Sequence, residues 1–91
     1  MVAFPYKKRV EALIRETRQL GNVIRRVRRL KGWSQSDLGE RSGLRQATIS
    51  GIETGKAAKL EPVLSILAAL DLELFIAPRS TSQPKEIEYL F

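Results

Sequence analysis

The sequence predicts an all-α domain of short helices followed by one short β-strand. Three observations support this prediction. Apolar residues recur at intervals of three and four through residues 20–70, the period of helices with one buried face. A glycine follows each of the first three patterns, as is common just beyond a helix C-terminus. After residue 71 the apolar spacing changes to two, the period of a strand.

The first predicted helix ends near Gly32. Its apolar residues recur at intervals of three and four: Leu20, Ile24, Val27 and Leu30. Arginines occupy most of the positions between them. Gly32 directly follows a lysine, and both residue types are favourable at a helix C-terminus.

A basic N-terminal extension, residues 1–16, precedes this helix. It is predicted to be helical as well, because the apolar pattern can be traced back to Val10. Thr17 is suited to be an N-cap, and Gly21 is unfavourable inside a helix. Both residues favour a break between the extension and the domain that follows, residues 17–77.

Two more helices are predicted between residues 34 and 55. Ser34 and Asp37 have the spacing of a capping box, in which a hydroxyl and an acid bond each other's backbone N–H groups. This second helix ends at Gly43. The third runs from about residue 45 to residue 54, and Gly55 terminates it.

A fourth helix begins at Leu60, with Pro62 in its first turn, where a missing N–H costs nothing. The following strand lies before Pro78. Its apolar residues are Leu72, Leu74, Phe75 and Ile76. One strand cannot make a sheet within a helical chain, so a second copy of the protein is the expected partner.

The last segment, residues 78–91, is predicted to be a flexible tail, because it is polar and rich in proline and serine. It nevertheless ends in apolar residues: Ile87, Tyr89, Leu90 and Phe91. Such residues at the tip of a tail suit a segment that becomes ordered on a partner.

Composition excludes several classes of protein. The chain has neither cysteine nor histidine, so disulfide frameworks, the usual zinc sites and histidine-activated nucleophiles are excluded. We therefore expect no enzyme, no metal and no cofactor. No apolar run approaches the roughly 20 residues that span a bilayer, and the N-terminus becomes charged too early for a signal peptide. A soluble, cytoplasmic, nucleoid-associated protein without membrane contact is expected.

The net charge of +6 is unevenly distributed. Residues 1–33 hold ten Lys or Arg and two Glu, a net charge of +8, whereas residues 60–91 have a net charge of −3. This distribution suits a polyanion on one side and a different partner on the other. A solvated basic helix that only improves solubility is the alternative.

Two short helices joined by a tight, glycine-containing turn form the central feature of the chain. The stretch from Gln19 to Ile76 resembles the Xre/Cro-type helix-turn-helix domain of phage repressors, a five-helix fold. The matching motifs are WSQSDLGERSGL, RQATISGIETGK and VLSILAALDL. The resemblance implies sequence-specific binding to double-stranded DNA.

Within that family, the chain is most similar to HipB-type antitoxins. The matching features are QLGNVIRRVRRLKGWSQ, RQATIS and the strand LELFI. The resemblance implies a homodimer, joined through that strand, that binds a palindromic operator, represses its own operon and holds a HipA-like serine/threonine kinase toxin. It also implies that Tyr89, Leu90 and Phe91 contact the toxin, although the family has a tryptophan near this end. The first sixteen residues are longer and more basic than the family requires.

The third helix is expected to place its first turns in the major groove, the only groove with a full base-pair code. Gln46 matches a base-reading glutamine of similar repressors, and its amide can pair with adenine N6 and N7. Ala47 is small enough to contact a thymine methyl group. Arg45 suits guanine or a phosphate, and Ser50 is a shorter, weaker reader.

Phosphate contacts set register and affinity without specifying sequence. The candidates are Ser34, Gln35, Arg41, Thr48, Lys56 and the exposed arginines of the first helix. Gln35 matches the family's glutamine that grips a phosphate and supports the reading glutamine. The resemblance further implies an internal ion pair between Arg28 and Glu53.

The resemblance also places Trp33 in the core rather than against DNA bases. The other predicted core residues are Ile24, Val27, Leu38, Leu44, Ile49, Ile52, Leu60, Leu64, Leu67 and Leu70. Two alternative functions remain open. One is a free-standing phage-type repressor without a toxin, and the other is a toxin-neutralising protein that binds DNA weakly.

Overall fold

The computed structural model describes residues 11–79, which contain four helices and no strand. They are α1 (Thr17–Leu30), α2 (Gln35–Ser42), α3 (Gln46–Glu53) and α4 (Leu60–Ala69). The predicted all-α class is confirmed. Only four of the five helices expected from the family resemblance occur within this range. Residues 72–79 adopt neither helix nor strand. Within residues 11–79, the predicted strand at residues 72–76 has no other strand with which to pair.

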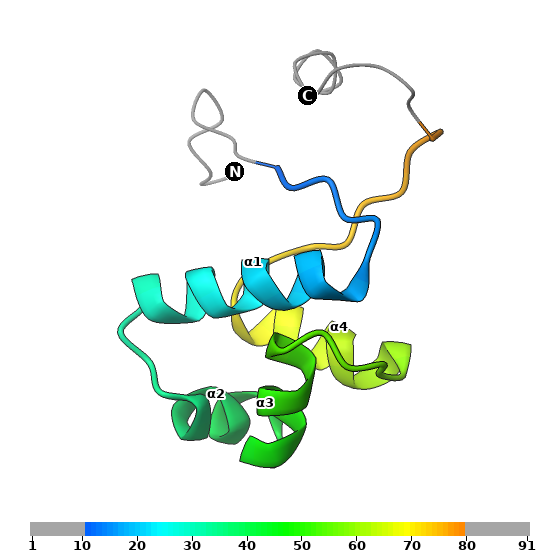
Figure 1. Ribbon diagram of the computed structural model, residues 1–91. Coiled ribbons are helices and arrows are strands. Elements are labelled where there is room, and N and C mark those ends of the chain that lie inside the picture. The colour runs from blue at the N-terminus through cyan, green and yellow to red at the C-terminus, as the bar shows by residue number, and fades with distance from the viewer. Residues whose placement is uncertain (1–10, 80–91) are drawn as a thin grey trace.

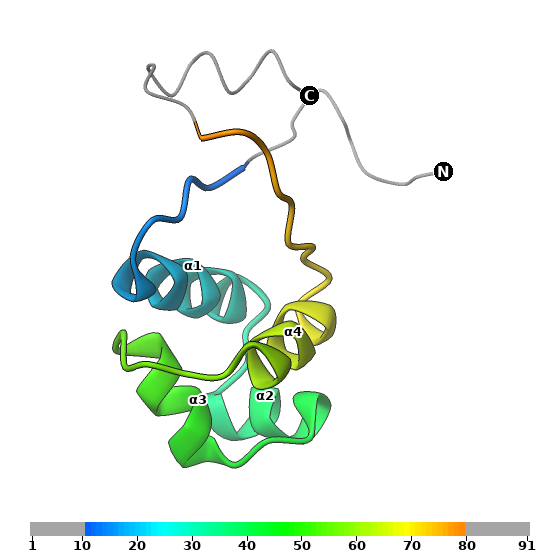
Figure 2. The same cartoon turned by 90° about the vertical axis from the view of Figure 1, so that its right-hand side faces the viewer.

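The helices pack around one small core. α3 packs against α1 and α2, and α2 also packs against α4. α2 and α3 lie at one end of the molecule, while the chain enters α1 and leaves α4 at the opposite end (Figures 1 and 2). The start of α3 is therefore well separated from both ends of the described chain.

α1 differs from its prediction at its start. Glu16, not Thr17, is the N-cap, and the Glu16 N–H donates to Gln19 Oε1 over 2.9 Å. Thr17 is the first helical residue, and its hydroxyl donates to the carbonyl of Gly55 over 2.7 Å. Residues 11–15 are not helical, so the predicted helical extension is wrong there, and residues 1–10 lie outside the described range.

α1 begins at Thr17, where the break between the extension and the domain was predicted, and Gly21 lies inside the helix. It is buried where α1 crosses α3, and a Cβ on it would lie 2.6 Å from the carbonyl oxygen of Glu53. Close approach of the two backbones, rather than a helix end, is therefore the reason for a glycine at this position.

α2 begins as predicted. The Asp37 N–H donates to Ser34 Oγ over 3.0 Å, and the Ser34 N–H donates to Asp37 Oδ2 over 2.9 Å, which completes the capping box. The bond from the backbone N–H of Ser34, then that from its side chain, lowers the pKa of Asp37. Gly43 ends α2 in the left-handed conformation, at φ 77°.

The core is built from one face of each helix. Its buried apolar residues are Ile24, Leu38, Ile49, Ile52, Val63, Ile66, Leu67 and Leu70. Val27, Trp33 and Leu44 are half-buried and pack against it. Six of the eight buried residues were predicted to lie in the core; Val63 and Ile66 were not.

The prediction was half wrong for α4: Leu67 and Leu70 are buried as predicted, but the other two predicted residues are not. Leu60 is 60% exposed and Leu64 is 43% exposed. Residues 63, 66, 67 and 70 have the spacing that places four side chains on one helical face. Because Leu60 and Leu64 are four residues apart, they share a different face.

No helix of the described part is long and apolar enough to cross a membrane.

Candidate nucleic-acid interface

The first turn of α3 holds three adjacent, exposed side chains. Arg45 is the N-cap, and Gln46 and Ala47 are the first two helical residues. Thr48 and Ser50, which follow in the same helix, are half-buried. The most accessible predicted base readers are therefore those at the N-terminus of α3, the part of such a helix that contacts base edges.

Gln46 is held against the start of α2. Its Nε2 donates to Gln35 Oε1 over 3.3 Å. Gln35 is the first residue of α2, and its own Nε2 donates to Glu53 Oε1 over 3.1 Å. The helix-turn-helix geometry thus brings the predicted reader and its predicted support into contact.

Glu53 is buried beneath these glutamines and paired with Arg28. Arg28 Nε donates to Glu53 Oε2 over 2.7 Å, and Arg28 Nη2 donates to Glu53 Oε1 over 2.9 Å. The pair joins the last residue of α3 to α1, and the two side chains are 9% and 0% exposed. A bidentate pair of this kind is strong and fixed in geometry.

The charge of Glu53 is stabilised despite its burial. Burial alone would raise the pKa of its carboxyl group. Hydrogen bonds from Arg28 and Gln35, together with the charges of Arg28 and Arg25, outweigh burial and lower the pKa below its ordinary value. The carboxylate therefore only accepts hydrogen bonds at neutral pH.

The predicted phosphate-binding residues do not form one cluster. Ser34 and Gln35 lie at the start of α2, beside Gln46. Arg41 lies in the last turn of α2, where its guanidinium group stacks on Trp33, 4.1 Å from the ring centroid. Lys56 is exposed in the loop after α3. Arg41 thus lies about two helical turns along α2 from Ser34 and Gln35.

Arg25 is a feature of the site that the sequence analysis did not single out. Its Nη2 donates to the carbonyl of Glu53 over 3.1 Å, while its side chain remains 36% exposed. Arg25 and Arg28 are three residues apart and therefore share one face of α1. This spacing could have predicted from the sequence that Arg25 also lies near Glu53. The hydrogen bond from Gln35 to Glu53 was also missed, and its residues are eighteen positions apart.

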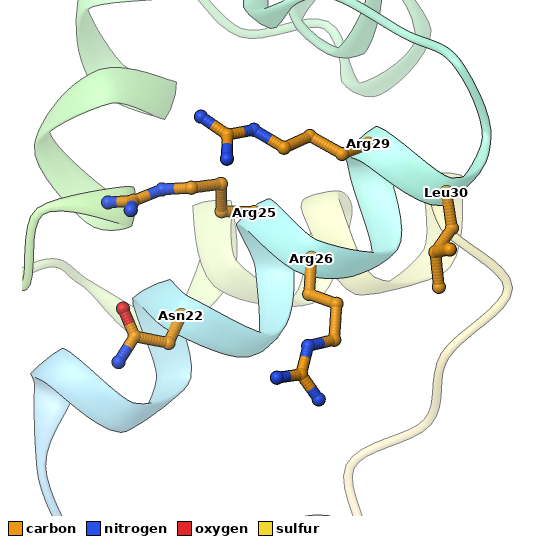
Figure 3. A pocket seen from close by; sticks show the side chains of 5 residues that line it. All are labelled: Asn22, Arg25, Arg26, Arg29 and Leu30. Atoms are coloured by element: carbon orange, nitrogen blue, oxygen red, sulfur yellow. The ribbon is translucent and has the colours of Figure 1, made fainter.

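α1 carries further exposed cations. The residues that line a shallow pocket on its surface are Asn22, Arg25, Arg26, Arg29 and Leu30 (Figure 3). Arg25 and Arg29 extend to one side of the helix, whereas Arg26 extends to the other, with Leu30 (Figure 3). A single flat surface therefore cannot contact Arg26 and the pair Arg25 and Arg29 equally well.

The segment predicted to form a dimer strand is only partly anchored. Leu72 packs against the core, and its N–H donates to the carbonyl of Leu67 over 2.7 Å. Leu74, Phe75 and Ile76 are exposed. The predicted toxin-binding residues of the tail, Tyr89, Leu90 and Phe91, lie outside the described residues. No group of acidic residues within residues 11–79 has the arrangement of a metal site.

Comparison with known proteins agrees with this architecture. Residues 24–75 match a family model described as helix-turn-helix. Antitoxin HipB of Escherichia coli K12 is 34% identical over 71 residues, which are 77% of this chain and 81% of HipB. The proteins matched are helix-turn-helix proteins, and this chain, like them, is not an enzyme.

Solved structures show the same similarity. The HipB-O4 20mer complex has a TM-score of 0.71 and 32% identity, covering 77% of this chain and all of that one. The HipA-HipB-O2-O3 complex gives 0.70 and 32%, with the same coverage. The restriction-modification controller protein C.AhdI of Aeromonas hydrophila gives 0.59 and 34%, covering 63% of this chain and 84% of that one.

Proposed function

The chain belongs to the Xre-type helix-turn-helix family that includes antitoxin HipB, and from this we propose that it is a sequence-specific DNA-binding repressor and antitoxin. The observation that carries the proposal is the exposed amide of Gln46 at the start of α3, hydrogen-bonded to Gln35 at the start of α2. A polar reader on a helix N-terminus, supported by a neighbouring helix, is suited to the major groove.

In this proposal, α3 reads bases and its surroundings grip phosphates. Gln46 pairs with adenine, with Arg45, Ala47 and Ser50 reading neighbouring positions. The phosphate contacts come from Ser34, Gln35, Arg41, Thr48, Lys56 and the exposed arginines of α1. Such a protein resides with the nucleoid.

The proposed active form is a homodimer. Residues 72–76 of two copies pair as antiparallel strands, burying Leu74, Phe75 and Ile76, which are exposed in the single chain. The two-fold axis then presents two α3 helices to successive major grooves, about 34 Å apart, on a palindromic operator.

The proposed protein partner is a HipA-like serine/threonine kinase toxin. Support comes from the similarity to HipB, which a solved structure contains together with HipA. We include repression of the protein's own operon in the proposal, and we assign toxin contact to Tyr89, Leu90 and Phe91 in the tail.

Operator binding tests the DNA-binding half of the proposal. Gln46→Ala is expected to cost about 1–3 kcal/mol on the operator and to leave binding to random DNA nearly unchanged, because only base reading is lost. Fluorescence anisotropy at a single salt concentration measures both affinities. Equal losses on operator and random DNA would show that Gln46 is not a reader.

Deletion of residues 84–91 tests the antitoxin half. No proposed base or phosphate contact lies in this segment, so operator binding is expected to stay the same. Affinity for the cognate toxin is expected to fall by at least about 1–2 kcal/mol, because aromatic anchors are lost. Calorimetric titration measures this affinity. Unchanged affinity would show that the toxin contacts the body of the dimer and not the tail. If the full-length protein does not bind the toxin at all, the antitoxin role is wrong, and the protein is a free-standing repressor.

A further inference from the structure

We infer that buried Glu53 determines which base Gln46 prefers, by fixing the orientation of the Gln46 amide through Gln35. This inference rests on the proposed function and assigns to the α1–α3 ion pair a second role besides stability. The residues Arg28, Glu53, Gln35 and Gln46 form a continuous series of hydrogen bonds, which we call the relay. It runs from the interior to the exposed start of α3.

The inner end of the relay has a fixed polarity. Both carboxylate oxygens of Glu53 accept hydrogen bonds from Arg28, and Arg25 Nε lies 3.8 Å from Oε1. These positive groups keep the carboxylate ionised, so it has no proton to donate. Any polar group that reaches it from the surface side has to present a donor.

Gln35 transmits this polarity outward. An amide has a donor side and an acceptor side, and only the donor side can face a carboxylate. Nε2 of Gln35 therefore points inward to Glu53, over 3.1 Å. Oε1 consequently points outward, where it accepts the hydrogen bond of Gln46 Nε2 over 3.3 Å. Reversing Gln35 would place its Oε1 against an oxygen of Glu53 at the inner end and its Nε2 against Gln46 Nε2, a second donor, at the outer end, so both hydrogen bonds would be lost.

The orientation of Gln46 follows from that of Gln35. One N–H of Gln46 is used on Gln35, which leaves the second N–H and Oε1 of this exposed side chain available to a ligand. One donor beside one acceptor complements adenine, whose N7 accepts and whose N6 donates. Guanine presents two acceptors at the same edge, N7 and O6. Without the relay, the amide can turn over and the preference weakens.

The test compares base preferences selected from a randomised DNA library. Full-length wild type and Gln46→Ala define the positions that Gln46 reads, which are those whose preference disappears in the variant. Gln35→Met is the decisive variant, because it breaks the relay and leaves the Arg28–Glu53 pair in place. At those positions, its preference for the wild-type base is expected to fall about fivefold or more, while preferences elsewhere persist.

Two further variants separate the relay from other roles. Lys56→Met removes an exposed cation outside the relay, and it is expected to weaken binding across all sequences without changing any preference. Glu53→Gln supplies an amide that both donates and accepts, so residue 53 no longer fixes the orientation of the Gln35 side-chain amide. Where this variant folds, it is expected to relax the same positions as Gln35→Met; where it does not fold, Gln35→Met carries the test.

The outcomes are distinct. Full preference in Gln35→Met, or a uniform loss of affinity like that of Lys56→Met, would overturn the relay and leave the proposed function intact. If Gln46→Ala changes no preference at any position, then base reading by Gln46 is wrong, and the relay fails with it.

Discussion

At the scale of single residues, Glu53 is the side chain on which the polar contacts of the interior converge. Its carboxylate accepts bonds from Arg28 and Gln35, and its carbonyl accepts one from Arg25. Within the described residues, no buried side-chain polar atom is left without a hydrogen bond. A small core tolerates this buried charge because both carboxylate oxygens accept hydrogen bonds and a guanidinium group balances the charge.

Removing one partner of the ion pair is expected to destabilise the fold strongly. Arg28→Met leaves the buried carboxylate of Glu53 with only Arg25 and Gln35, and it should cost about 3–5 kcal/mol. Arg26→Met is the matched control, because Arg26 is exposed on the same helix and should change stability by less than about 0.5 kcal/mol. Urea denaturation followed by circular dichroism measures both. Similar losses in the two variants would argue against a stabilising pair.

The pH dependence of stability provides a second, independent prediction for the pair. Because the pKa of Glu53 is lowered in the folded state, its contribution is present above the ordinary carboxyl pKa and is lost as the pH falls through the folded value. In Arg28→Met, the hydrogen bonds that oppose the effect of burial on Glu53 are fewer, so the pKa of its carboxyl group rises. Protonation at acidic pH then favours the folded state of the variant. The stability difference between wild type and variant should therefore shrink on acidification. A constant difference from neutral to acidic pH would contradict it.

Sequence reasoning at this scale reached only part of the site. Gln35, Gln46, Arg28 and Glu53 were all named, because a known motif assigns a role to each position. The bond from Gln35 to Glu53 was not, since nothing local couples a helix start to a residue eighteen positions away. Whether the proposed readers and phosphate contacts bind DNA stays a prediction.

At the scale of elements, local chemistry was a better guide than periodicity. The capping box of α2 and the glycine ends of α1 to α3 were predicted, because each depends on residues within a few positions. The inner face of α4 was only partly predicted, because most residues of this helix are apolar and its packing decides which of them are buried. The reason for a glycine at position 21 was missed as well, because it lies in the packing of α1 against α3.

The crossing of α1 and α3 is expected to require a glycine at position 21. In Gly21→Ala, the new Cβ would lie 2.6 Å from the carbonyl oxygen of Glu53 and would also meet that of Ile52. Both are backbone atoms, so α1 and α3 must separate, at a cost of about 1–3 kcal/mol. Thermal unfolding measured by circular dichroism reports the change.

Gly51→Ala is the control for this prediction. Position 51 is also helical, but a Cβ there meets only Lys56 Cδ at 3.7 Å, an ordinary contact. Alanine is favoured over glycine within helices by about 0.5–1 kcal/mol, so this variant should be neutral or slightly more stable. Equal destabilisation by both substitutions would mean that helix crossing is not the reason for Gly21.

At the scale of the whole molecule, the two ends of the structure have different proposed tasks. No large apolar side chain is exposed on α2 or α3, whereas Leu74, Phe75 and Ile76 are exposed in the segment that leaves the opposite end (Figures 1 and 2). This separation allows a second copy to pair at one end without covering the proposed DNA-reading helix. The sequence predicted the apolar segment, but the described part of the chain contains no second strand with which it could pair.

Removing residues 73–91 is expected to give a folded monomer. Leu72 is retained in this truncation because its packing on the core and its bond to Leu67 close the end of α4. The matched control removes only residues 80–91, keeps the exposed apolar segment, and should remain dimeric. Without the dimer, each half-site binds alone, so operator affinity should fall about a hundredfold or more. Sedimentation equilibrium and anisotropy measure the two effects, and circular dichroism checks that the helices persist. If the shorter protein is still a dimer, the interface lies elsewhere, and the extension at residues 1–16 becomes the first place to search.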